Sequence, residues 1–125
     1  MDVLKHIHFS LFHYVILSVV KDLITSTLCK QILHFVHLRS TEAMPGGNFI
    51  ESTHLKGRGH LIDLIRIFEK ENPGLPMRVD HGRMMLGDED KGYNAGYSFH
   101  GRMLALAQVE GMMAVIEDEM KNGCA

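Results

Sequence analysis

The sequence has few cysteines, little net charge and no long apolar run, and each of these absences excludes a class of protein. Two cysteines in 125 residues, Cys29 and Cys124, cannot form a disulfide framework, which favours a reducing compartment and predicts a cytoplasmic protein. Thirteen basic and fifteen acidic residues give a formal charge of -2, so no basic surplus points to nucleic acid or to an acidic membrane surface. Histidine and methionine, nine of each, are the residue types in excess.

The most apolar stretch, Leu11 to Val20, is shorter than a membrane helix, which needs about 20 such residues. An acidic second residue and the lack of a small-residue cleavage site argue against a signal peptide. We therefore interpret residues 1–30 as a separate apolar segment containing a buried strand or helix. The histidines His6, His8 and His13 would suit a small metal-binding module, but no acidic or cysteine partner follows at ligand spacing, which favours structural roles.

From residue 31 onward the pattern predicts alternating strands and helices. Gln31 to Arg39 is nearly all apolar, which is typical of a parallel strand buried on both faces. Ser40 to Gly59 is rich in Gly, Ser, Thr and Pro and predicts a long loop. His60 to Lys70 predicts an amphipathic helix, Leu75 to Val79 a short strand and Phe99 to Lys121 a long helix.

The two helices each carry an apolar stripe at helical spacing, which we expect to form the core. The expected stripe of the first helix consists of Leu61, Leu64, Ile65 and Phe68. The expected stripe of the second helix consists of Leu106, Val109, Met113, Ile116 and Met120.

A strand, a helix and a second strand in this order predict two parallel strands with a right-handed crossover, and chemistry at their carboxyl ends. His37 ends the first strand and Asp80 directly follows the second. An imidazole and a carboxylate suit Mn²⁺, Fe²⁺ or Zn²⁺, although His37 is equally well explained as a core histidine. Asp80 is harder to explain otherwise, because a carboxylate beside a buried strand is costly unless it is paired or ligating.

Further candidate residues surround these two positions. His81 suits acid–base catalysis, because an ordinary imidazole titrates near neutrality. Arg39 and Arg83 would fork onto a substrate carboxylate, although an isolated arginine is more often a solvated surface charge. Tyr97 precedes the last helix, where its phenol would donate a proton or pack against a neighbour.

Four stretches of the chain resemble mannonate dehydratases, in the family's order and near its spacing. They are HFVHLRS from residue 34, FIESTHLKG from residue 49, LPMRVDHGRMM from residue 75 and GYSFHGRMLALAQVEGM from residue 96. The resemblance runs from about residue 31 to about residue 120. It implies a TIM-type barrel, related in layout to xylose isomerase, which converts D-mannonate to 2-keto-3-deoxy-D-gluconate and water in hexuronate (glucuronate) catabolism with Mn²⁺ or Fe²⁺.

The same resemblance implies roles for individual residues. His37 and Asp80 match metal ligands of the seventh and eighth barrel strands. His81 and Tyr97 match residues assigned to proton transfer, and Arg39 is similar to an arginine near the substrate. The implied position of His54, in the His-Leu-x-Gly pattern of the loop, is the rim of the site.

The sequence departs from the family in one important respect. The family takes two further metal ligands, a histidine and a cysteine, from earlier strands, and Cys29 lies too close to His37 to replace that cysteine. A complete barrel also needs about 250 residues. We therefore expect residues 31–125 to be the C-terminal βαβα portion of a truncated (β/α)₈ barrel. The alternative to a lyase is an inactive fragment, or a subunit complementing a chain that supplies the missing strands.

Overall fold

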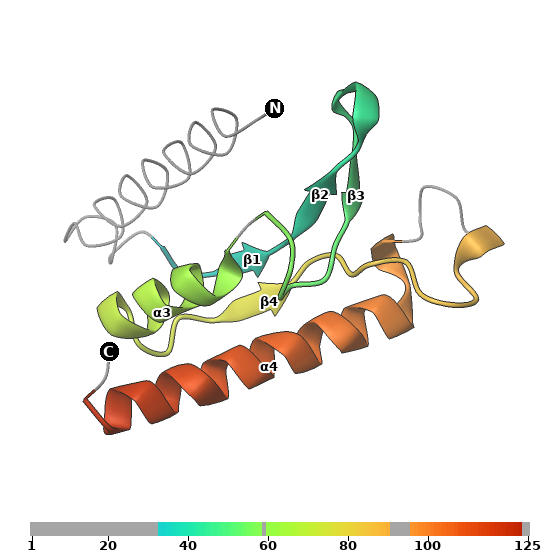
Figure 1. Cartoon of the computed structure of the whole chain (residues 1–125). Helices are drawn as coiled ribbons and strands as arrows, with labels where there is room; N and C mark the ends of the chain where they lie inside the picture. The colour runs from blue at the N-terminus through green and yellow to red at the C-terminus, as the bar shows by residue number, and fades with distance from the viewer. Residues whose placement is uncertain (1–32, 59, 91–95, 124–125) are drawn as a thin grey trace.

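The computed structural model describes residues 33–58, 60–90 and 96–123. This part of the chain is a small mixed α/β structure with short strands and two helices (Figure 1). Its elements in chain order are β1 (Val36–Leu38), β2 (Thr41–Ala43), the 3₁₀ turn η1 (Pro45–Gly47), β3 (Phe49–Glu51), α3 (Leu61–Glu71), β4 (Met77–Val79) and α4 (Phe99–Lys121). The predictions for Leu11 to Val20, for His6, His8 and His13, and for both cysteines fall outside the described residues.

Strands β1 and β4 form a two-stranded parallel sheet, as the strand–helix–strand pattern predicts. His37 lies opposite Arg78 in the register, and Leu38 lies opposite Val79. The pairing continues past both strands, because the Asp80 backbone N–H donates to the Leu38 carbonyl at 3.0 Å. The two carboxyl ends therefore lie at the same edge of the sheet.

Helices α3 and α4 pack on one face of this sheet and against each other. The buried members of this core are Leu38, Leu61, Ile65, Val109, Met112 and Ile116. The strand residues that join them, Val36, Met77 and Val79, alternate with residues of the other face. The prediction of burial on both faces is wrong for the described part of the chain. Phe35 is 47% exposed, because the two described helices, α3 and α4, cover the opposite face.

Helix α4 has the predicted bounds but a different buried face. Its buried residues are Gly101, Ala105, Val109, Met112 and Ile116. Val109 and Ile116 were expected there, whereas Leu106 and Met120 are 40% and 41% exposed. The reason is that the first turns of α4 approach the backbone after β4 so closely that only small residues fit. A Cβ atom on Gly101 would lie 2.3 Å from the Arg83 carbonyl oxygen.

The predicted loop from Ser40 to Gly59 contains an antiparallel hairpin formed by β2 and β3, which corrects the expectation of an irregular segment. Gly46 and Gly47 have positive φ angles of 78° and 83°, which glycine adopts without strain at the tip. The Met44 N–H donates to the Asn48 carbonyl at 2.8 Å and closes the turn. The hairpin projects away from the two helices (Figure 1).

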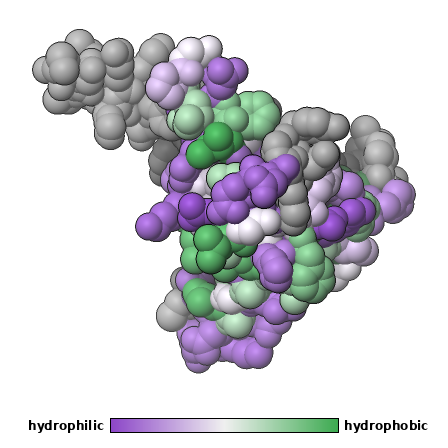
Figure 2. Space-filling view, turned by 90° about the vertical axis from the view of Figure 1, so that its right-hand side faces the viewer, coloured by the Kyte–Doolittle hydropathy of each residue, from purple (hydrophilic) through white to green (hydrophobic). Residues whose placement is uncertain are grey.

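Many large apolar side chains of the described residues remain at the surface. Leu86 is 93% exposed and Phe99 is 68% exposed. The space-filling view shows apolar areas among hydrophilic ones on the face turned to the viewer (Figure 2). Within residues 33–58, 60–90 and 96–123, neither helix has the length and apolar character needed to cross a bilayer.

Candidate metal and proton-transfer site

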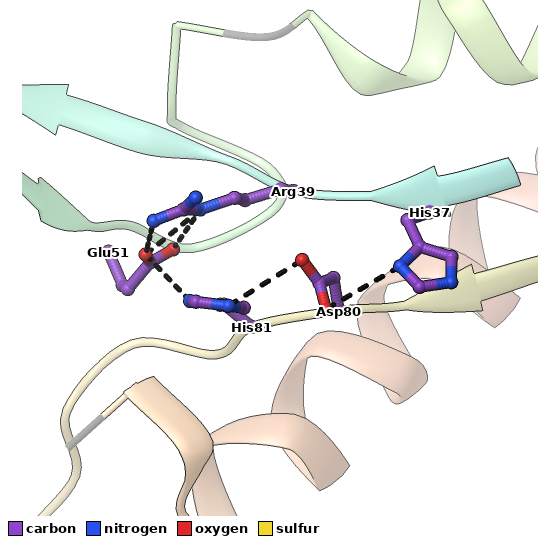
Figure 3. Close-up of polar contacts among 5 residues, drawn as sticks. All are labelled: His37, Arg39, Glu51, Asp80 and His81. Atoms are coloured by element: carbon purple, nitrogen blue, oxygen red, sulfur yellow. Dashed lines mark hydrogen bonds and ion pairs between the residues drawn. The ribbon is translucent and has the colours of Figure 1, made fainter. Parts of the chain in front are cut away.

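The carboxyl ends of β1 and β4 bring His37 and Asp80 together. The His37 Nδ1 atom lies 3.6 Å from Asp80 Oδ1, and the two side chains face each other across the strand ends (Figure 3). They are 47% and 28% exposed, so both remain accessible. The predicted adjacency of this imidazole and this carboxylate is confirmed, and their role as metal ligands remains a prediction.

The spacing of this pair is compatible with the binding of one metal ion by both side chains. Two donor atoms that bind one ion through bonds of about 2.0–2.2 Å are roughly 3.4 Å apart in a tetrahedral arrangement. The separation of 3.6 Å between His37 Nδ1 and Asp80 Oδ1 fits that requirement with little movement. No group of three or more His, Cys, Asp or Glu side chains suited to a metal occurs among the described residues. The described residues therefore bring together two candidate ligands, fewer than the three that catalytic sites commonly use.

His81 lies next to this pair and contacts three other side chains. Its Nδ1 atom lies 2.9 Å from Glu51 Oε1 and its Nε2 atom 3.5 Å from Asp80 Oδ2. The ring of Tyr97 packs against it, with 4.3 Å between centroids and 54° between planes. His81 is largely buried whereas Tyr97 is 52% exposed. The two residues predicted to transfer protons are thus in direct contact.

Glu51, at the end of β3, connects Arg39 to His81 (Figure 3). The Arg39 Nε atom donates to the two carboxylate oxygens of Glu51 at 3.0 and 3.3 Å, and its Nη2 atom also donates to Oε1. The hydrogen bond to Glu51 raises the pKa of Arg39 above its ordinary value. The guanidinium carbon lies 5.2 Å over the centre of the Phe49 ring. A substrate carboxylate that binds Arg39 would therefore accept hydrogen bonds from the same guanidinium group as Glu51 does.

The sequence reasoning did not single out Glu51. Its only signal was a lone acidic residue after Phe49 and Ile50 within one of the family-like stretches. Nothing local indicated that the hairpin would carry this carboxylate to within reach of residues 12 positions before it and 30 positions after it.

The structure places the two other predicted substrate-binding residues apart from this polar cluster. His54 is buried at 3% exposure, and its predicted place at the rim of the site stays a prediction. Its backbone N–H donates to Gln108 Oε1 at 2.8 Å, and its ring lies near the Leu38 carbonyl. Burial lowers the pKa of His54, an effect that the Leu38 carbonyl and the charge of Glu51 partly oppose. Arg83 is exposed.

Two glycines allow the backbone to come close to the site. A Cβ atom on Gly82 would lie 2.1 Å from the Gly101 carbonyl carbon, in the first turn of α4. A Cβ atom on Gly96 would lie 2.9 Å from Glu51 Cγ and 3.4 Å from His81 Nδ1. The Gly82 N–H also donates to the Gly96 carbonyl at 3.0 Å. These contacts hold the segment after β4 between the hairpin and α4.

Comparison with known proteins identifies the family. A family model described as D-mannonate dehydratase (UxuA) matches residues 18–123, a wider range than the sequence motifs covered. Mannonate dehydratase 2 of Agrobacterium fabrum is 33% identical over 99 residues, which are 72% of this chain and 25% of that protein. The mannonate dehydratase of Saccharophagus degradans is 33% identical over 68% of the chain and 24% of its own length, and that of a Marinomonas species 38% over 64% and 23%. The chain thus spans about a quarter of the length of these relatives.

Proposed function

The chain belongs to the D-mannonate dehydratase family, and on this premise we propose that it supplies part of a site for the dehydration of D-mannonate. The product is 2-keto-3-deoxy-D-gluconate, formed with release of water in hexuronate catabolism in the cytoplasm. The observation that carries the proposal is the pair of His37 and Asp80, with 3.6 Å between Nδ1 and Oδ1 at the carboxyl ends of two parallel strands.

The proposed metal is Mn²⁺ or Fe²⁺, held by His37 and Asp80 together with ligands from outside the described residues. Such an ion, when bound, would withdraw electron density from the substrate carboxylate and the 2-hydroxyl group, which would make the C2 proton more acidic. Arg39 would orient the carboxylate through the part of its guanidinium that Glu51 leaves accessible. Arg83 and His54 are further proposed substrate-binding residues.

His81 and Tyr97 are the proposed proton-transfer residues. One removes the proton from C2, and the other protonates the C3 hydroxyl group as the C3–O bond breaks and water leaves. The resulting enol takes up a proton at C3 and loses the proton of its 2-hydroxyl group to solvent, which gives the 2-keto acid. The contact between the two rings supports this pairing. Which of the two residues acts as the base is left open.

The uncovered face of the sheet supports a larger assembly. Among the described residues, β1 and β4 pair only with each other, and the face carrying His37 has no layer of helices. Unpaired strand edges favour pairing with further strands. We propose that this unit is the C-terminal βαβα part of a (β/α)₈ barrel, and that strands outside the described residues, on this or another chain, complete the metal site.

Manganese binding tests the ligand assignment. We expect weak Mn²⁺ binding by the chain, measured by electron paramagnetic resonance of the free ion. Binding should fall about tenfold or more in His37→Ala and in Asp80→Asn, because each loses one of two ligands. His34→Ala is the matched control, since His34 is an exposed histidine of the same segment, and it should bind as the parent does. Unchanged binding in Asp80→Asn would contradict the proposed site.

A second function, a complementing subunit without catalysis of its own, is favoured because the described residues contain no group of three or more side chains that could hold a metal ion. The formation of keto acid from D-mannonate separates the two. We expect slow product formation by the chain alone with Mn²⁺, and rapid turnover would show that no further strands are needed. No Mn²⁺-dependent product at all would favour the complementing subunit.

A further inference from the structure

Glu51 is placed to act on two predicted site residues at once. Its carboxylate is 13% exposed and receives Arg39 from the end of β1 and His81 from the segment after β4. The closest contact from each of these residues is made by the same oxygen, Oε1. The hairpin thus brings one acceptor to the junction of three elements, β1, β3 and the segment after β4 (Figure 3).

We propose that Glu51 is a positioning residue that fixes the His81 ring with its proton on Nδ1 and its lone pair on Nε2. A carboxylate at 2.9 Å from Nδ1 can only accept a hydrogen bond, so Nδ1 must carry the proton. A neutral imidazole then keeps its basic lone pair on Nε2. The assignment rests on the proposed function, because it prepares Nε2 for proton transfer beside the Asp80 carboxylate.

Asp80 does not draw the His81 ring proton to Nε2 instead. The distance from His81 Nε2 to Asp80 Oδ2 is 3.5 Å, which is longer than the usual range of about 2.7–3.2 Å for an N–H···O hydrogen bond. The contact with Glu51 is much shorter and therefore dominates the orientation of the ring. Arg39 strengthens this arrangement, since its hydrogen bonds to the Glu51 carboxylate hold that side chain in place.

The surroundings of His81 hold the ring in this orientation. Tyr97 packs against one side of it at 4.3 Å between centroids. Gly96 brings backbone close to the contact between Glu51 and His81, where a Cβ atom would lie 3.4 Å from Nδ1. The ring is 13% exposed, so little water competes for Nδ1. A simple surface ion pair would not need these supports.

The test measures where the His81 proton lies, by long-range ¹H–¹⁵N correlation on the full chain labelled at histidine. Spectra are recorded near pH 8.5, where an ordinary imidazole is neutral, and His81→Gln identifies the His81 signals. We expect the Nδ1–H form in the parent chain. Glu51→Gln should retain it, because the amide oxygen can replace Oε1. Glu51→Ala should lose at least half of it to the Nε2–H form, because no acceptor remains.

The matched control is Glu42→Gln, which changes an acidic residue on the partner strand of the same hairpin and should leave the His81 signals unchanged. A parent chain with the proton on Nε2 would overturn the proposal, even if Glu51→Ala fails to fold. So would a folded Glu51→Ala chain that keeps the parent's Nδ1–H form. The measurement needs neither metal nor D-mannonate. An Nδ1–H form in a chain without lyase activity would therefore support the positioning role and favour the complementing subunit.

Discussion

The two-stranded parallel sheet with its helices and the antiparallel hairpin are held together by different forces. The first region, β1, α3, β4 and α4, buries aliphatic side chains such as Ile65 and Ile116 at 0% exposure. The hairpin, β2 and β3 with η1, leaves Phe49 58% and Ile50 47% exposed. It is fixed by polar contacts instead, chiefly those of Glu51.

This difference separates stability from site geometry. Full burial of a large aliphatic side chain contributes about 1.5–3 kcal/mol, whereas an exposed ion pair contributes roughly 0–1 kcal/mol. Substitutions in the helices and the parallel sheet should therefore affect folding, and substitutions in the hairpin should affect mainly the orientation of site residues. The candidate site lies where the two regions meet.

The largest expected effect comes from the apolar core. Ile65→Ala should lower the free energy of unfolding by about 2–5 kcal/mol, because it leaves a cavity among α3, α4 and the sheet. The same substitution in the hairpin, Ile50→Ala, should change it by less than about 0.5 kcal/mol. Urea denaturation followed by circular dichroism compares the two. Equal losses would show that the hairpin is packed as tightly as the core.

Glycine substitutions test the close approach at the start of α4. Gly82→Ala should lower the free energy of unfolding by about 1–3 kcal/mol, because the added Cβ meets Gly101 backbone at 2.1 Å. Gly111→Ala lies in the middle of α4 with nothing within 4 Å of the added atom. It should raise the free energy of unfolding by about 0.5–1 kcal/mol. A harmless Gly82→Ala would contradict the close packing of this segment.

The buried His54 ring predicts a loss of stability in acid. Burial lowers its pKa below the ordinary value of 6.5, so the unfolded chain binds a proton before the folded chain does. The contribution of the neutral His54 ring to the free energy of unfolding is complete above pH 6.5. It declines as the pH falls toward the folded-state pKa, by at most about 1.4 kcal/mol per pH unit. His54→Gln should reduce this decline in urea denaturation, whereas His100→Gln, at an exposed histidine of α4, should not.

The smallest expected effect concerns the ion pair between the two helices. Arg66 Nε lies 3.0 Å from Glu119 Oε2, and both side chains are 31% exposed. Glu119→Gln should therefore lower the free energy of unfolding by only about 0.2–1 kcal/mol. The difference in unfolding free energy from the parent should shrink in 1 M salt, because the Debye screening length is then only about 3 Å. A loss as large as that of Ile65→Ala would place this pair among the main stabilising contacts.

The sequence predicted the packed region well because its signals are local. The apolar stripe that includes Leu61, Ile65 and Phe68 matches the buried residues of α3. The strand–helix–strand order implied the parallel pairing that places His37 beside Asp80. The bounds of α4, Phe99–Lys121, were also predicted. Its buried face was predicted only in part, at Val109 and Ile116, because the contact at Gly101 depends on backbone that lies elsewhere in the chain.

The hairpin and its carboxylate could not be predicted in the same way. Its strands are three residues long and mostly exposed, so they show no clear alternation of apolar and polar residues. The bridge from Arg39 through Glu51 to His81 joins residues from three elements. Such long-range polar contacts leave no periodic trace in a single sequence, although the family-like stretch did contain Glu51.

The most direct test of the central claim is a Mn²⁺ titration followed by line broadening in the amide ¹H–¹⁵N spectrum of the chain. Manganese bound between the two strand ends should broaden the signals around His37 and Asp80 first, and those of the hairpin tip at Gly46 and Gly47 much later. Asp80→Asn should abolish this early broadening. Broadening that begins elsewhere, or that is the same in Asp80→Asn, would contradict the account.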